Sequence, residues 1–223
     1  NSTAATDSGV GSRTFPFKTL DHAISQATAG QQLRVAAGVY LETISLKQGV
    51  SMYGGYDSGD WSAARDTSAN LTVIRNSANQ RTVQADNFDD SVATIVDGFL
   101  IQGGTPASPG TGQQIAVDIN NASPTFTNNT IEAVVGDGGT TSDYAFGVYI
   151  EDQSPSDSIA TEPIFQNNTI EGDTGNDADR TFAVHVASEI SQLTLDNNEI
   201  NGGEAVSLAW AINLENFTGG DRS

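Results

Sequence analysis

The chain contains no cysteine and few basic residues: nine lysines and arginines stand against 28 aspartates and glutamates, which gives a formal net charge of −19. The lack of cysteine excludes disulfide scaffolds, cysteine-ligated zinc and thiol catalysis. So acidic a surface repels polyanions, which argues against DNA or RNA as a partner and requires a bridging cation for any anionic polysaccharide. No apolar run approaches the roughly eighteen residues of a membrane span, so we expect no transmembrane helix.

The start of the sequence also lacks the features of an export signal. The chain begins at Asn1, with neither a basic segment nor an apolar segment after it, so a signal peptide is either absent or already removed. The missing cysteines fit an exported protein. We therefore expect a bacterial protein of the cell surface or the medium, whose signal peptide has been cleaved.

The 223 residues are enough for one domain or one elongated repeat array, with a core that needs no disulfides. In the first 32 residues, apolar side chains recur at helical spacing, at Leu20, Ala23, Ile24 and Ala27. Thr19 is suited to begin this helix and Gly30 to end it. From residue 33 onward the pattern changes to short strands rich in β-branched residues.

The second half of the chain is repetitive. Residues 126–131, 165–170 and 195–200 read FTNNTI, FQNNTI and LDNNEI, and a weaker copy ends at Ile101. The aligned isoleucines, at 101, 131, 170 and 200, are therefore 30, 39 and 30 residues apart. Such periods are typical of solenoid proteins.

A second strand precedes each copy, at residues 116–120, 147–151, 183–187 and 209–213. Each alternates, so that Val117 points one way and Asp118 the other, and this alignment predicts that Trp210 faces the core. Two-strand units with constant facing cannot bury their apolar side alone, so we expect them to stack as coils. A β-sandwich is disfavoured because the strand facing repeats in register.

Two stretches carry a family resemblance. GVGSRTFPFKTLDHAISQA with LRVAAGVYLETISL, and the segment from Met52 to Ile74, resemble the start of secreted bacterial proteins of the pectate-lyase-like superfamily. The resemblance implies an all-β chain, a right-handed parallel β-helix in one domain over residues 1–223, with an N-terminal segment and capping helix at 1–32 and coils at 33–223. It implies no particular activity, because this fold includes lyases, glycosidases, esterases, adhesins and tailspikes.

The paired asparagines of the repeats have a structural interpretation. Stacked coils would place Asn129, Asn168 and Asn198 above one another at a sharp turn, where asparagine tolerates left-handed geometry and its amide bonds the next coil. We therefore predict an asparagine ladder rather than a ligand site.

The outward residues of the longer strands form the most chemically varied feature. Coils about 4.8 Å apart should align Asp118, Tyr149 and His185 on one face. A lyase would use histidine and tyrosine as base and acid, whereas a glycosidase would use Asp118 with Glu151, roughly 8 Å apart by strand geometry and within the inverting range. The candidate catalytic residues are Asp118, Tyr149, Glu151 and His185, and the candidate ligand-binding residues are Asn120 and Arg180. The alternative is that these outward positions are simply polar.

Acidic, glycine-containing loops follow two of the repeats, and such oxygen-rich loops suit calcium. No established calcium motif is present, so a solvated polar loop is the alternative. The candidate ligands are Glu132, Asp137, Asp143, Glu171, Asp173, Asp177 and Asp179.

Three further expectations concern aromatic residues, the chain end and function. We expect Arg65 to stack on Trp61, although Trp61 with its neighbouring tyrosines would also suit a sugar platform. The last residues begin another repeat, so we expect further repeats of a longer protein, or another chain, to cap this end. The sequence favours an extracellular module that binds a polysaccharide or cell-surface component or is structural, with a polysaccharide lyase or glycosidase as the alternative.

Overall fold

The computed structural model describes residues 7–76, 81–104, 113–134, 144–153, 159–175 and 178–215. These residues form one short helix, α1 (Leu20–Gln26), and three parallel six-stranded sheets, A, B and C. Sheet A contains β1 (Gln32–Ala36), β4 (Ser51–Tyr56), β7 (Ile95–Asp97), β10 (Thr125–Thr127), β13 (Ile164–Gln166) and β16 (Thr194–Asp196). Sheet B contains β2 (Gly38–Leu41), β5 (Thr72–Arg75), β8 (Leu100–Gln102), β11 (Thr130–Glu132), β14 (Thr169–Glu171) and β17 (Glu199–Asn201). Sheet C contains β3 (Ile44–Ser45), β6 (Arg81–Phe88), β9 (Gln113–Ala122), β12 (Tyr144–Glu151), β15 (Arg180–Val186) and β18 (Leu208–Leu214).

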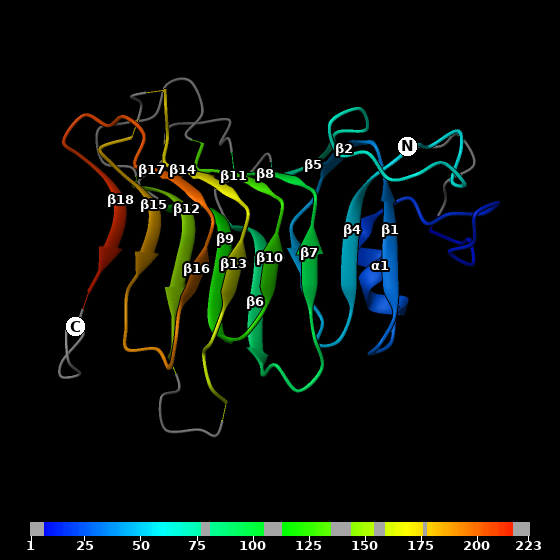
Figure 1. Cartoon of the computed structure of the whole chain (residues 1–223), viewed down its shortest axis with the longest axis horizontal. Coiled ribbons are helices and arrows are strands. Elements are labelled where there is room, and N and C mark those ends of the chain that lie inside the picture. The colour runs from blue at the N-terminus through cyan, green and yellow to red at the C-terminus, as the bar shows by residue number, and fades with distance from the viewer. Residues whose placement is uncertain are drawn as a thin grey trace.

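Each coil contributes one strand to each sheet, and successive coils pair in parallel along the long axis of the molecule (Figure 1). Parallel crossovers of this kind are right-handed, so the chain is a right-handed parallel β-helix. The predicted fold is thereby confirmed. No helix of the described residues is long and apolar enough to cross a membrane.

The core is built from identical residues stacked coil upon coil. Ile74, Ile101, Ile131, Ile170 and Ile200 pair in register through sheet B. On sheet A, Phe126 and Phe165 stack with ring centroids 5.2 Å apart. The repeat of the isoleucines in the sequence is therefore the repeat of the core.

Helix α1 closes the N-terminal end of this core. Leu20 and Ile24 are buried in the same cluster as Ile44 of the first coil. The predicted start at Thr19 is confirmed, but its side chain makes no capping bond. Instead the Glu42 carboxylate accepts hydrogen bonds of 3.0 Å from the backbone N–H groups of Leu20 and Asp21, which satisfies two of the donors that a helix start leaves free.

The asparagine ladder is confirmed. The side-chain amide of Asn129 donates to Oδ1 of Asn168 at 3.2 Å, and that of Asn168 donates to Oδ1 of Asn198 at 3.0 Å. The preceding asparagines, Asn128, Asn167 and Asn197, have φ of 54°, 55° and 52°, the left-handed region that asparagine tolerates. A second pair, missed in the sequence, joins Asn121 to Asn87 at another corner.

The corners of the coil differ in length. Between sheets A and B the strands are always joined by two residues, as from Thr127 to Thr130 and from Gln166 to Thr169. Between sheets B and C, from β8 to β9 and from the corresponding strands of the next three coils, 10, 11, 8 and 6 residues intervene. Variation in coil length is therefore placed away from the asparagine corner.

The prediction that Arg65 stacks on Trp61 is wrong. The Arg65 guanidinium lies 5.8 Å from the Tyr53 ring centroid and forms an ion pair with Asp97. Trp61 instead stacks on Tyr56, with centroids 6.3 Å apart. Arg65 joins the first coils because its Nε also donates to the Gly54 carbonyl at 2.5 Å.

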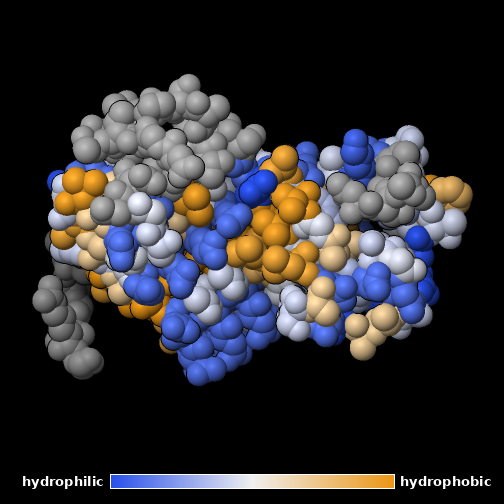
Figure 2. Space-filling view, turned by 90° about the horizontal axis from the view of Figure 1, so that it is seen from above, coloured by the Kyte–Doolittle hydropathy of each residue, from blue (hydrophilic) through white to orange (hydrophobic). Residues whose placement is uncertain are grey.

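The opposite end of the core is more exposed. β16, β17 and β18 are the last strands of their sheets in the described part of the chain, and Ile212 and Leu214 of β18 are exposed. Elsewhere apolar side chains gather in one patch among polar ones when the molecule is seen from above (Figure 2). Helix α1 thus covers one end of the coil stack, and no described element covers the other.

Candidate functional site

The candidate residues meet on the outer face of sheet C. Gln84, Asp118, Tyr149, His185 and Asn213 occupy one row across β6, β9, β12, β15 and β18. Asn120 and Glu151 pair in the next outward row. The predicted alignment of Asp118, Tyr149 and His185 is therefore confirmed.

The alignment of the last strand was wrong by two residues. Phe182 pairs with Trp210 and His185 with Asn213, so Asn213, not Ala211, continues the row. Trp210 accordingly lies on the outer face, 41% exposed, and not in the core. The Trp210 prediction is thus corrected.

Each long strand carries a short motif that the sequence reasoning missed. Residues 115–118, 146–149, 182–185 and 210–213 read IAVD, FGVY, FAVH and WAIN. The two middle positions of the first and third copies belong to the main core, whereas Ile115, Phe146 and Phe182 form a separate cluster with Tyr144 and Tyr149. The strands therefore break their alternation, and both the large first residue and the polar fourth residue face outward. This four-residue pattern is the signal that would have aligned the last strand correctly.

Asp118 is a buried carboxylate. It is 4% exposed, and Arg81 Nε lies 2.5 Å from its Oδ2 as an ion pair, without the orientation of a hydrogen bond. Its Oδ1 has no hydrogen-bond partner among the described residues. Burial raises the pKa of Asp118 to about 6; Arg81 opposes this rise, and the charges of Glu151 and Asp86 add to it. Asp118 thus exchanges a proton within the range of ordinary working pH.

Tyr149 and Glu151 interact on the same strand. Burial, the Glu151 and Asp118 charges and a hydrogen bond with Glu151 raise the pKa of Tyr149 to about 12, so the phenol stays protonated at neutral pH. Gln153 Nε2 donates to Glu151 at 2.5 Å, and its backbone N–H donates to Asn120 Oδ1 at 3.2 Å. The turn after β12 therefore holds Asn120 and Glu151 in place.

His185 lies inside the aromatic cluster. It is 6% exposed, and its ring centroid lies 5.1 to 5.3 Å from those of Phe182, Phe146 and Tyr149. Asn213 Nδ2 lies 3.0 Å from Nδ1; because an amide nitrogen donates, Nδ1 accepts and the ring proton is on Nε2. Burial lowers the pKa of His185, with the Glu215 charge opposing. The imidazole is thus a neutral, packed group.

Arg180 does not join this row. Its guanidinium is 5.5 Å from the Tyr144 ring centroid and 3.7 Å from the Asp179 carboxylate, and it pairs in register with Tyr144 near the start of the strands. The basic residue beside Asp118 is Arg81, which the sequence reasoning missed. Arg81 occupies the first position of RTVQ (residues 81–84), the same motif position as Ile115.

The candidate calcium ligands lie apart from one another. Glu132 and Glu171 are neighbours in sheet B, Asp173 is buried, and Asp179 accepts a hydrogen bond from Ser207. Asp137, Asp143 and Asp177 lie outside the described residues. Within the described ranges, no three acidic or histidine side chains are grouped as metal ligands.

The comparison with known proteins agrees with the fold. Residues 3–215 match the family described as "Protein of unknown function (DUF1565)". No curated protein and no solved structure matches the chain. Because the family match covers nearly its whole length, the chain belongs to the DUF1565 family.

Proposed function

We propose that this chain is a binding module of an exported or cell-surface bacterial protein, and that the outer face of sheet C binds a neutral polysaccharide. The observation that carries this proposal is the division of the row into packed and available groups. Asp118 and His185 are buried against Arg81 and the aromatic cluster, whereas Tyr149, Glu151 and Asn120 remain partly exposed beside them. The two groups best suited to proton transfer are thus less accessible than the groups suited to binding.

The exposed groups suit sugar recognition. A partly exposed tyrosine ring offers a flat apolar surface with a polar edge, and carboxylate and amide oxygens accept hydrogen bonds from hydroxyl groups. The net charge of −19 opposes a polyanionic glycan. Both properties favour a neutral polysaccharide lying across the strands.

The connections of sheet C support a recognition role as well. The connections of variable length between sheets B and C end at its strands, and loops next to a rigid scaffold are where proteins place binding residues. A solenoid further offers an extended surface along its stacked repeats. A long polymer matches such a surface better than a small molecule does.

A polysaccharide panel tests the binding proposal. We expect the protein to be retarded in affinity electrophoresis by at least one neutral polysaccharide and not by polyuronates, and Tyr149→Ala to weaken that retardation about tenfold. Phe15→Ala is the matched control, because Phe15 is an exposed aromatic residue of the N-terminal segment. Failure to bind any neutral polysaccharide, or equal binding by Tyr149→Ala, would overturn the proposal.

One observation favours a second candidate, an inverting glycosidase. Asp118, with its pKa raised to about 6, and Glu151 lie on neighbouring strands and two residues apart, as general acid and general base would. Substrate would have to displace the Arg81 side chain, which is 44% exposed. Release of reducing ends that is lost in both Asp118→Asn and Glu151→Gln would establish this activity, whereas a binding module releases none.

A further inference from the structure

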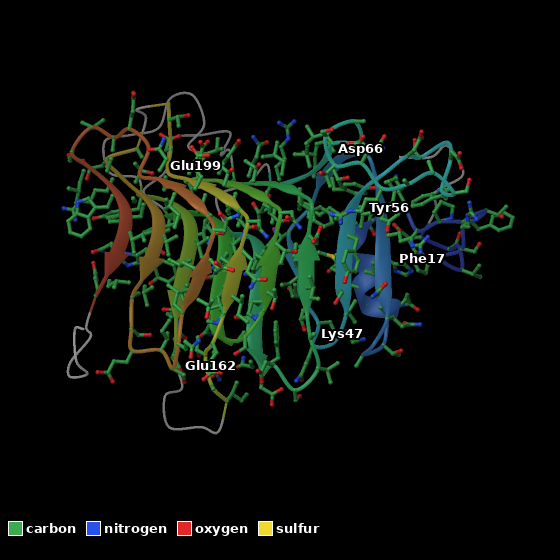
Figure 3. All side chains as sticks on the ribbon, in the orientation of Figure 1. Phe17, Lys47, Tyr56, Asp66, Glu162 and Glu199 are labelled. Carbon is green, nitrogen blue, oxygen red and sulfur yellow. The ribbon has the colours of Figure 1, made fainter. Side chains whose placement is uncertain are left out.

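A cavity at the N-terminal end of the coil stack is separate from the sheet C row. It has a volume of about 250 Å³ and lies between the N-terminal segment, α1 and β1. Phe17, Leu20, Leu33, Tyr40 and Trp61 line it. Phe17 and Tyr56, the latter stacked on Trp61, both lie at this end of the molecule (Figure 3).

Two arginines meet at this cavity. Arg13 and Arg34 are both exposed and both belong to its lining. Neither forms an ion pair within the described ranges, although the Arg13 charge helps to lower the pKa of Asp60 after that residue's hydrogen bonds to Ser62 and Ala63. The Arg34 guanidinium lies 5.4 Å from the Tyr56 ring centroid, which places it beside the aromatic wall.

The charge of the chain singles out this end. Residues 1–65 contain five basic and five acidic residues, whereas residues 66–223 contain four basic and 23 acidic residues. An anion is therefore repelled by most of the sequence but not by the segment that forms the cavity.

The walls of the cavity are held by hydrogen bonds and ring contacts. The Asp7 carboxylate accepts from the backbone N–H and hydroxyl of Thr19, both at 3.0 Å. Phe17 packs edge-on against His22, with centroids 4.9 Å apart. A pocket that is formed before binding loses less entropy when a ligand enters.

The cavity also contains an unpaired strand edge. All five residues of β1 line it, and β1 is the first strand of sheet A, paired on one side with β4. In the described chain no strand pairs with its second edge. Peptide groups on that edge are available as donors and acceptors.

We propose that this cavity binds a carboxylate attached to a compact apolar group. The apolar group fills the space between Phe17, Leu33 and Trp61, and the carboxylate reaches Arg13 and Arg34. Two sources share this chemistry: a small aromatic acid, and the C-terminal residue of a peptide whose backbone extends along β1.

Binding of 3-phenylpropionate tests the proposal, with uncharged 3-phenylpropanamide as the matched ligand. By isothermal titration calorimetry, we expect the acid to bind at least tenfold more tightly than the amide, because charge-assisted bonds to guanidinium are stronger than neutral ones. A peptide Gly-Gly-Phe with a free carboxylate that binds more tightly than the acid would assign the peptide source; weaker binding would assign the small acid. Equal affinity for acid and amide would overturn the proposal.

Substitutions locate the site. Arg34→Gln and Arg13→Gln should each weaken acid binding about tenfold and leave the amide unaffected, since each removes one exposed cation. Arg75→Gln, which removes an equally exposed arginine on sheet B, should change neither. Ala23→Phe should block both ligands by filling the cavity, and if it impairs folding the exposed arginine variants still decide the result. Unchanged acid binding in the Arg13→Gln/Arg34→Gln double variant would overturn the assignment.

Discussion

The side-chain amide of Asn168 donates a hydrogen bond to Oδ1 of Asn198, one coil further on, at 3.0 Å. Asn168 is 2% exposed, and its amide also donates to the Phe126 carbonyl while its Oδ1 accepts from the backbone N–H of Asn129. Asn168→Ala should lower the free energy of unfolding by about 2–4 kcal/mol, because it leaves buried backbone groups unsatisfied. Urea unfolding measures this, and Asn198→Ala, at a half-buried position of the last coil, should cost clearly less. Equal costs would contradict the role of burial.

Asp118 should make stability depend on pH. Its folded pKa of about 6 lies above the ordinary value of 3.8, so the folded state binds the proton more tightly. The contribution is therefore full below about pH 4 and is lost as pH rises through about 6, by about 3 kcal/mol for two units. Asp118→Asn should accordingly be more stable than the unchanged protein above pH 7 and equal to it near pH 4. Melting curves between pH 4 and pH 8 test this, and a constant difference would contradict it.

Removing the cation beside Asp118 provides a second test of the same linkage. Arg81 opposes the rise in the pKa of Asp118, so Arg81→Gln should move the loss of stability to higher pH. The same melting curves measure the shift. A curve that moves to lower pH, or does not move, would show that Arg81 does not act on this carboxyl.

Gly98 should not tolerate the residue that its neighbours suggest. It has φ of 79° and stands where the next three coils have Asn128, Asn167 and Asn197. A Cβ there would overlap Nη2 of Arg65, so Gly98→Asn should lower the free energy of unfolding by about 2 kcal/mol or more. The reverse change, Asn128→Gly, should cost about 1 kcal/mol or less, because glycine accepts this φ. A neutral Gly98→Asn would contradict the close packing.

The outer aromatic cluster should control the ionisation of His185. Phe182 is buried against its ring, and burial lowers the pKa of His185. Phe182→Ala should admit water, raise that pKa toward 6.5 and cost about 3 kcal/mol of stability. Trp210→Ala, at the exposed last position, should change both quantities much less. Titration of the imidazole by NMR gives the pKa, and an unchanged value would show that the ring is not desolvated by Phe182.

Much of the fold could be predicted because the same residues recur at each coil. Ile131 and Ile170 show the period of the core, and Asn129 and Asn168 the sharp turn, since each needs only its own copy in the next coil. The face carrying Asp118 and His185 followed from strand alternation.

The neighbours of those residues could not be predicted in the same way. Strict alternation placed Trp210 in the core, whereas two successive residues of each long strand face inward and shift the pattern. The ion pair of Asp118 with Arg81 joins residues from different coils whose sequences differ, so no repeat announces it. The N-terminal cavity likewise depends on how a non-repetitive segment folds over α1.

The two-residue corner between sheets A and B and the variable connections next to sheet C divide the coil into a constant and a changeable part. Insertions or exchanges at the sheet C connections leave the register of the asparagine corner untouched, and long surface insertions carry only a small entropic cost. Evolution can therefore diversify what one face recognises without redesigning the core. A protein engineer can use the same division, grafting new loops beside sheet C while the asparagine corner keeps the coils aligned.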